Sequence, residues 1–252
     1  MDFADPAQRA VFFEVHSGLP REGPGDRATI DRALEFIGPL PPDPEILDIA
    51  CGPGGQTIDL AELIPDARIT AVDPWPPFLR DLEARATRAG VAQRIRAMPG
   101  DMSKLAFELA SFDLLWCEGA AYIMGLPEAM AAWKPLLRRG GALALSEPVW
   151  LKTERPERVR ACWAEYPRMA DVEAARACAL KAGYEIVGDF VLSEAAWWTN
   201  YYGPLEASLD AVTPRRAGDP VAQAVLDEIR LEIDCYRRHA DCYGYLFLVL
   251  RA

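Results

Sequence analysis

Short apolar runs alternate with stretches of helical periodicity through the middle of the chain. The apolar runs predict strands at Ile46–Ala50, Arg68–Val72, Ile95–Met98, Phe112–Cys117 and Ala142–Ser146. Apolar positions three or four residues apart predict helices at Thr57–Ile64, Phe78–Ala89 and Pro127–Leu137, the last ended by the glycines of Arg138-Arg139-Gly140-Gly141. Strands this apolar, each followed by a helix, favour an α/β fold with a parallel sheet covered on both faces. Ligands bind at the carboxyl edge of such a sheet.

The two ends of the chain follow a less regular pattern. Helices are predicted at Ala7–His16, Ala28–Ile37, Arg155–Tyr166, Val172–Ala182 and Pro220–Arg238, and strands at Tyr184–Leu192 and Tyr243–Leu250. The segment from Ser193 to Pro214 is rich in Trp and Tyr and has no clean period, which is typical of an insertion or lid. We therefore expect an N-terminal helical cap and linker (1–44), a ligand-binding core (45–150) and a C-terminal part of the same domain with a lid or substrate-binding insert (151–252).

Charge and composition exclude several classes of function. The chain has 252 residues and a formal net charge of −11, from 27 Lys and Arg against 38 Asp and Glu, which repels nucleic acid and anionic membrane surfaces. It has no apolar run long enough to span a membrane, and its acidic first residues lack the pattern of a signal peptide, so we expect a cytoplasmic protein. The two His and six Cys show no metal-ligand spacing, and no metal site is expected.

A glycine-rich turn follows the first strand of the predicted core. Gly52 and Gly54 let the backbone approach a ligand, and Asp48 precedes them within the strand. Asp73 lies 21 residues after Gly52, at the end of the next strand, where nucleoside-binding folds place the acid that holds the ribose diol. A dinucleotide fingerprint would place a third small residue at the position of Thr57, so NAD fits this turn less well.

These motifs resemble those of the class I S-adenosylmethionine (SAM)-dependent methyltransferases over about residues 45–150. The residues that carry the resemblance are Asp48-Ile49-Ala50-Cys51-Gly52-Pro53-Gly54 (with Ala50 in place of a glycine), Asp73, Asp101, Phe112-Asp113-Leu114-Leu115-Trp116-Cys117 and Leu136-Leu137-Arg138-Arg139-Gly140-Gly141-Ala142-Leu143. Gly52-x-Gly54-Gly55-Gln56-Thr57, Glu118-Gly119-Ala120-Ala121-Tyr122 and Ser146-Glu147 are similar to a branch of small bacterial methyltransferases whose substrates are mostly unassigned. The resemblance implies a Rossmann-like, seven-stranded, mostly parallel sheet with helices on both faces.

The resemblance also implies which residues contact the cofactor, SAM, and its product S-adenosylhomocysteine (SAH). They are Asp48, Ala50, Cys51, Gly52, Gly54, Gln56, Asp73, Pro74, Gly100, Asp101, Met102, Glu118 and Gly119. Arg21 is either an exposed loop residue or a ligand of the SAM carboxylate, and Trp75 either stacks near the adenine or shapes its turn.

Candidate catalytic residues lie where the fourth and fifth strands end. Glu118, Tyr122 and Glu147 are expected there, and a carboxylate at this edge can accept a proton or bind an amine. The alternative is that the two acids cap their own loops. The candidate substrate-binding residues are Tyr122, Trp150, Trp198, Tyr201 and Tyr202. Aromatic side chains can enclose a cationic or flat substrate, although ordinary packing explains each one singly.

The predicted function is methyl transfer from SAM to a small-molecule acceptor. No metal, nucleic acid or membrane partner is expected, and a homodimer is left open. An NAD(P)-dependent oxidoreductase and a non-catalytic SAM-binding protein are the alternatives.

Overall fold

A computed structural model describes residues 3–252, and its centre is one seven-stranded sheet. The strands are β1 (Glu45–Ile49), β2 (Arg68–Asp73), β3 (Ile95–Pro99), β4 (Phe112–Cys117), β5 (Leu137–Trp150), β6 (Glu185–Val191) and β7 (Tyr243–Arg251). Their order in the sheet is β3-β2-β1-β4-β5-β7-β6. The pairs among β1 to β5 are parallel, and β7 runs antiparallel to both β5 and β6. The predicted fold class is therefore confirmed.

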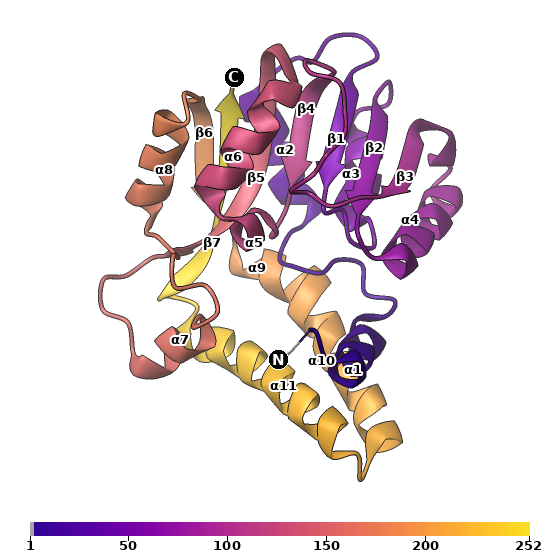
Figure 1. Cartoon of the computed structure of the whole chain (residues 1–252), viewed down its shortest axis with the longest axis vertical. Coiled ribbons are helices and arrows are strands. Elements are labelled where there is room, and N and C mark those ends of the chain that lie inside the picture. Colours follow the sequence, from indigo (N-terminus) through magenta and orange to yellow (C-terminus); the bar gives the residue numbers. More distant parts are fainter. Residues whose placement is uncertain (1–2) are drawn as a thin grey trace.

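Helices cover both faces of the sheet (Figure 1). One face carries α2 (Arg27–Ile37), α3 (Gly55–Leu63) and α4 (Pro76–Arg88). The other face carries α5 (Ala121–Met124), α6 (Leu126–Trp133) and α8 (Val172–Lys181). The strands are apolar on both faces because both are buried, as the continuous burial of β4 and β7 shows.

A third group of helices lies beyond the carboxyl edge of the parallel strands, at the bottom of Figure 1. It consists of α1 (Pro6–His16), α7 (Glu157–Cys162), α9 (Glu194–Trp197), α10 (Gly203–Val212) and α11 (Pro220–His239). A π-helix at Trp198–Tyr202 joins α9 to α10. Short 3₁₀ helices lie at Ala92–Arg94, Lys134–Leu136 and Thr213–Arg216. The N-terminal helix α1 packs on α10 and α11, so distant parts of the sequence build this group together.

Three sequence-based expectations about the elements were wrong. The glycines Gly140 and Gly141 do not end a helix but lie inside β5, which is much longer than the predicted Ala142–Ser146. Residues 193–214 are helical rather than irregular. The helix predicted at Arg155–Tyr166 is confined to Glu157–Cys162. Among residues 3–252, the structure has no helix that is both long enough and apolar enough to cross a membrane.

Candidate active site

The glycine turn after β1 is held in a conformation that favours small residues. Ala50, Gly52 and Gly54 have positive φ angles of 58°, 53° and 83°. A Cβ on Gly54 would lie 2.2 Å from Cδ1 of Leu82, so only glycine fits there. The Gln56 side chain donates to the carbonyl of Cys51 at 2.9 Å and thereby closes the turn. The turn is thus pre-shaped before any ligand binds.

Asp73 links the end of β2 to this turn. Its Oδ2 accepts from the Gly52 amide at 3.0 Å, and its Oδ1 accepts from the Trp75 amide at 2.8 Å. The side chain is almost fully buried, and this burial raises the pKa of Asp73 although the two amides lower it. Each carboxylate oxygen keeps a second lone pair that can accept from a hydroxyl.

The end of β3 is more open. Asp101 is exposed and its Oδ1 accepts from the amide and the hydroxyl of Ser103, which lowers the pKa of Asp101. Met102 is half-buried, and Pro74 is exposed beside Asp73. Gly100 lies close to Val72, with Cγ1 only 2.5 Å from where a Cβ would stand. The expected adenine-side residues therefore lie together at neighbouring strand ends, largely open to solvent.

Arg21 is not the exposed loop residue that the sequence suggested. It is 4% exposed, and its guanidinium donates to Oε2 of Glu118 at 2.7 Å and to Oδ2 of Asp59 at 2.8 Å. The other oxygen of Glu118 accepts from the indole of Trp116 at 2.8 Å. Burial raises the pKa of Glu118, while Arg21 lowers it.

Asp48 adds a further carboxylate beside this ion pair. It is fully buried, and its Oδ2 accepts from the hydroxyl of Thr57 at 2.5 Å while its Oδ1 has no partner. Burial, with a smaller contribution from the charge of Glu118, raises the pKa of Asp48 to about 7. Asp59 and Glu118 thus contact Arg21, Asp48 lies nearby, and Arg27 lies 3.7 Å from Asp59, so three acids face two guanidinium groups, an arrangement that suits a ligand ammonium group.

The segment between α1 and α2 covers the turn. The carbonyl of Pro20 accepts from the Gly55 amide at 3.1 Å, and Cγ of Glu22 lies 3.3 Å from the Cβ position of Gly52. Nδ1 of His16 lies 2.6 Å from Oε2 of Glu22, and Oε1 of Glu22 is buried without a partner. Glu22 could not be recognised from the sequence, because it lies outside every motif.

Trp75 does not project as a free adenine platform. Its ring stacks on Phe13 of α1 at 3.9 Å between centroids, with the planes 10° apart. Phe13 also contacts Phe78 edge-on. Trp75 therefore ties the N-terminal helix to the start of α4.

Glu147 lies on β5 just beyond the end of β4 and is 2% exposed. Its Oε1 accepts from the hydroxyl of Tyr166 at 2.6 Å, and its Oε2 is buried without a partner. Burial raises the pKa of Glu147 to about 8. The ring of Tyr122 lies 5.3 Å from that of Tyr166.

Glu147 is close to the expected methionine end of the cofactor site. The neighbouring Ser146 hydroxyl accepts from the Gly119 amide at 2.8 Å. The Tyr245 ring of β7 lies 3.8 Å from where a Cβ on Gly119 would stand. Burial raises the pKa of Tyr245, with further contributions from Tyr122, Glu147 and Glu232. Tyr245 was missed by sequence reasoning because it lies far along the chain, in the final strand.

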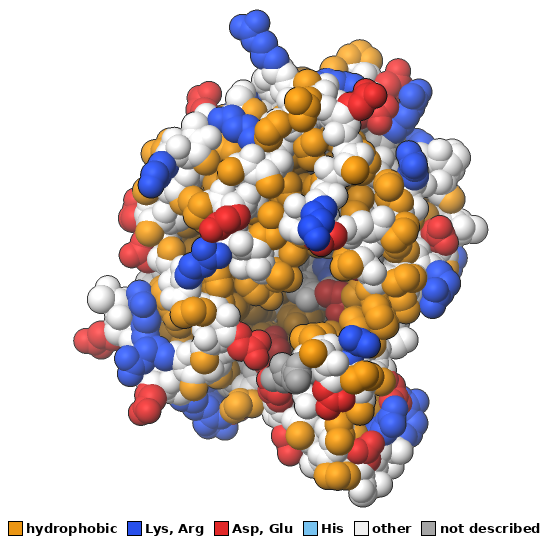
Figure 2. All heavy atoms as spheres, viewed as in Figure 1, with side chains coloured by type: hydrophobic (Ala, Val, Ile, Leu, Met, Phe, Trp, Pro, Cys, Tyr) orange, Lys and Arg blue, Asp and Glu red, His pale blue; other side chains and the backbone are white. Residues whose placement is uncertain are grey.

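The π-helix contributes two buried tyrosines. The hydroxyls of Tyr201 and Tyr202 donate to Oε1 of Glu232 on α11 at 3.3 and 3.0 Å. Six ionisable groups act on one another electrostatically near these helices, and we call them the tyrosine–glutamate cluster: Tyr122, Glu147, Tyr166, Tyr201, Glu232 and Tyr245. Figure 2 shows a hollow between the sheet body and the lower helices, with acidic side chains in its depth.

The two expected substrate-binding tryptophans are engaged elsewhere. Trp150 is buried at the end of β5, with the guanidinium of Arg155 4.7 Å from its ring centre. Trp198 is half-buried and lies under Arg237 at 4.9 Å. Neither of these contacts places the two tryptophans in the tyrosine–glutamate cluster. Their assignment as substrate-binding residues stays a prediction.

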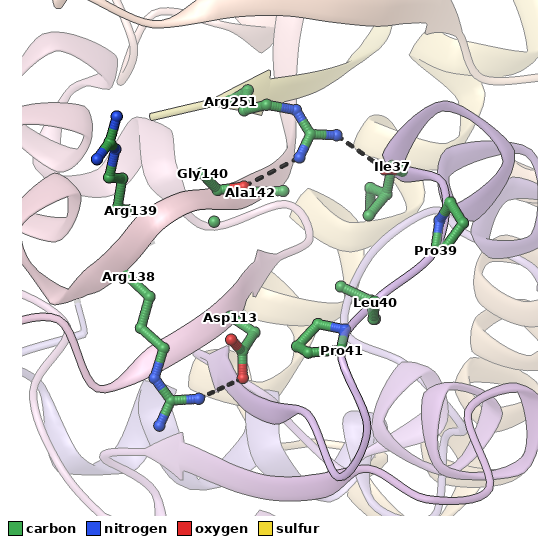
Figure 3. A pocket seen from close by; sticks show the side chains of 11 residues that line it. Ile37, Pro39, Leu40, Pro41, Asp113, Arg138, Arg139, Gly140, Ala142 and Arg251 are labelled. Atoms are coloured by element: carbon green, nitrogen blue, oxygen red, sulfur yellow. Dashed lines mark hydrogen bonds and ion pairs between the residues drawn. The ribbon is translucent and has the colours of Figure 1, made fainter.

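A separate pocket of about 330 Å³ lies at the opposite edge of the sheet (Figure 3). Arg138 pairs with Asp113 there, and Arg251 donates to the carbonyls of Gly140 and Ile37. These partners engage two of the three arginines that line the pocket, the third being Arg139, and no residue of the glycine turn lines it. In the described residues 3–252, no group of three or more His, Cys, Asp or Glu side chains is arranged to hold a metal ion.

Residues 46–141 match the family described as "Methyltransferase domain". This range contains the glycine turn, Asp73 and the end of β4. Over these residues the chain is therefore similar to a methyltransferase domain, in agreement with the resemblance drawn from the sequence motifs.

Curated relatives share mainly this domain. An uncharacterized protein of Synechococcus is 37% identical over 101 residues, 40% of this chain and 24% of that protein. Trans-aconitate 2-methyltransferase of Deinococcus radiodurans is 31% identical over 125 residues, 48% of this chain and 45% of that protein. The enzyme of the same name from Paracidovorax citrulli is 27% identical over 179 residues, covering 68% and 66%. The chain thus spans from about a quarter to just under two thirds of these relatives' lengths.

Solved structures resemble the whole chain in fold. A SAM-dependent methyltransferase from Geobacter sulfurreducens in complex with SAH has a TM-score of 0.82 at 22% identity, covering 96% of this chain and 97% of that one. A SAM-dependent methyltransferase from Thiobacillus denitrificans in complex with SAH has the same score and identity, covering 96% and 98%. The N-terminal helices and the C-terminal helical part are therefore included in a known architecture.

Proposed function

We propose that this protein is a SAM-dependent methyltransferase that methylates a small-molecule acceptor. The observation that carries the proposal is the bond between Asp73 and the Gly52 amide, which sets a buried carboxylate beside the glycine turn. SAM supplies a methyl group already activated on a sulfonium, so the protein has to align the acceptor, exclude water and manage one proton. The domain match and the SAH complexes of the structural neighbours support this proposal.

The residues fit each part of SAM. Asp73 is assigned to the ribose diol, and Asp101 with Met102 to the adenine edge. The backbone of the turn from Ala50 to Gly54 is assigned to close contact with the cofactor. Gly119 and the acids around Arg21 are assigned to the methionine end, where the excess of carboxylate fits its ammonium group. Glu118 is assigned to this end as a fixed negative charge and not as a base, because both of its oxygens already accept hydrogen bonds.

The hollow in Figure 2 is assigned to the acceptor, and the cluster is proposed to line it. The net charge of −11 disfavours nucleic acid as the acceptor. Trans-aconitate, named for two relatives, is one candidate acceptor. Tyr122 and Glu147 are the residues proposed to meet the acceptor.

Asp73→Ala tests the cofactor site. Losing charge-assisted bonds to the ribose should weaken SAH binding by about 1.5–3 kcal/mol, or roughly 10- to 150-fold in Kd. Isothermal titration calorimetry measures this. Asp73→Asn keeps one oxygen, which can accept from the amide of Gly52 or Trp75, and it removes the charge with less change of shape than alanine; the exposed Asp66→Ala is the matched control. Unchanged SAH affinity in both Asp73 variants would contradict the assignment.

A further inference from the structure

The tyrosine–glutamate cluster contains a buried carboxylate oxygen that lacks a donor. Oε2 of Glu147 has no partner, while Oε1 is fixed by the Tyr166 hydroxyl at 2.6 Å. A buried acceptor left without a donor costs about 1–3 kcal/mol. Because Tyr166 fixes the orientation of the carboxylate, the free oxygen is held ready for a hydrogen-bond donor from a ligand.

The free oxygen lies beside the proposed methyl-transfer position. Glu147 follows Ser146, whose hydroxyl clamps the Gly119 amide at the end of β4. Tyr245 lies next to Gly119, and its pKa is raised by burial and then by Tyr122, Glu147 and Glu232. Glu147 pairs with Leu246 and lies on the opposite face of the sheet from Tyr245, so Glu147, Tyr166 and Tyr122 are the side chains that can meet an acceptor together beyond the end of β4.

The charges and rings of the cluster favour a cation. Glu232 faces the tyrosines of the π-helix and accepts from two of their hydroxyls. Phenol rings attract a cation through their faces, and burial strengthens this attraction. The cation Arg168 acts on Glu147 from a distance, but its guanidinium is held by Glu128 and is largely exposed. A bound ammonium would favour the ionised form of Glu147, whereas an anionic acceptor would oppose that ionisation, and this difference discriminates against an anion.

Building on the proposed function, we propose that the acceptor is a primary or secondary amine that binds as an ammonium against Oε2 of Glu147, beside the rings of Tyr122 and Tyr166. Glu147 then acts as the base. The ammonium gives one proton to Oε2, and its nitrogen forms the new C–N bond to the methyl carbon. The C–S bond breaks with its electron pair on the sulfur of SAH, the methylated nitrogen carries the positive charge, and Glu147 returns its proton to water.

The inference separates this protein from a polycarboxylate methyltransferase. Trans-aconitate carries three carboxylates, and any of them placed against Oε2 of Glu147 would face another acid instead of a hydrogen-bond donor. Shared sequence with the trans-aconitate enzymes lies mainly in the cofactor domain, so it does not fix the acceptor.

Matched ligand pairs test the inference by binding as well as by turnover. The full-length protein, saturated with SAH, is titrated with n-butylamine against pentanoate, phenethylamine against 3-phenylpropionate, and trans-aconitate. The same amines are then incubated with methyl-labelled SAM and the products are measured by mass spectrometry. We expect at least one amine to bind tenfold or more tightly than its carboxylate partner. Glu147→Gln should weaken that amine at least tenfold and leave SAH affinity within twofold, whereas the exposed control Glu154→Gln should change neither.

Three results would overturn the inference: tighter binding of a carboxylate, no binding by any amine, or unchanged amine binding in Glu147→Gln. Failure of the wild-type protein to bind SAH would instead refute the proposed function. The same ligand pairs are therefore also titrated without SAH, and absence of an amine preference there overturns the amine inference by itself.

Discussion

Two buried carboxyl groups, Glu147 and Asp48, are held at the carboxyl edge of the sheet with one oxygen bonded and the other free. Burial raises the pKa of Glu147 to about 8 and that of Asp48 to about 7. Groups with such pKa values exchange protons near neutral pH, which suits a general base. Glu118, by contrast, is bonded through both oxygens and serves better as a fixed charge.

The raised pKa of Glu147 predicts a pH-dependent stability. The neutral form is favoured in the folded state, so this contribution is complete below the ordinary value of 4.5 and is lost as pH rises through about 8. Each pKa unit corresponds to about 1.4 kcal/mol. The melting temperature of the wild type should therefore fall relative to Glu147→Gln by several degrees between pH 5 and 9, measured by differential scanning calorimetry.

The exposed variant Glu154→Gln is the control for this series, and its curve should run parallel to the wild type. A wild-type curve parallel to that of Glu147→Gln would contradict the prediction. Several ionisable groups interact electrostatically with Glu147. They are Tyr122 of α5, Tyr166 and Arg168 after α7, Cys117 of β4, Cys178 of α8 and Tyr245 of β7. They are retained in every variant, so their titration cancels in the comparison.

At the scale of elements, the segment between α1 and α2 is fastened to the core through Arg21. The substitution Arg21→Gln leaves Glu118 buried without its cation. Breaking such a buried pair lowers the free energy of unfolding by about 3–5 kcal/mol. A chain of this size loses about 2–4 °C of melting temperature per kcal/mol. We therefore expect a fall of at least 6 °C by calorimetry. Arg27→Gln, at a 45% exposed side chain, should cost less than about 1 kcal/mol.

The double variant Arg21→Gln/Glu118→Gln distinguishes the ion pair from simple loss of packing. Removing both charges should recover part of the lost stability, because no uncompensated carboxylate then remains at Glu118. Equal losses in the single Arg21 and Arg27 variants would show that the buried pair does not fasten the segment.

The sequence predicted the alternating core well because strand and helix periods are strong there. It failed at β5, where Gly140 with a φ of 75° adjoins an irregular pairing with β4 instead of ending a helix. It also failed from 193 to 214, since the wider turn at Trp198–Tyr202 shifts the helical phase and hides the period.

The candidate site was predictable only where its residues follow one another in motifs. The glycine turn and Asp73 are local features of successive strands. Arg21, Tyr245 and Glu232 come from the N-terminal segment, the last strand and α11, and their meeting depends on how three distant elements pack. No spacing rule connects such positions, so only the folded chain shows them together.

At the scale of the whole molecule, the proposed ligand sites lie between two bodies that distant segments join. The sheet provides the glycine turn and Glu147, whereas α1, α10 and α11 form the lower side of the hollow (Figures 1 and 2). The N-terminal segment bridges them, because Arg21 contacts Glu118 and the Gly25 amide donates to the carbonyl of Ala196 at 3.0 Å. A ligand in this position stabilises both bodies at once.

Ligand-dependent melting of the intact protein therefore separates the proposed cofactor from its rival. A ligand at one hundred times its Kd stabilises the folded state by about 2.7 kcal/mol, which corresponds to roughly 5–11 °C for a chain of this length. We expect SAH to produce this shift, and Asp73→Asn to reduce it at the same SAH concentration because the ribose loses a charged acceptor. NADH and NADPH should produce no shift, since Thr57 is bonded to Asp48 at the position where a dinucleotide turn needs a small residue. Stabilisation by a nicotinamide cofactor without an effect of SAH would favour the oxidoreductase alternative.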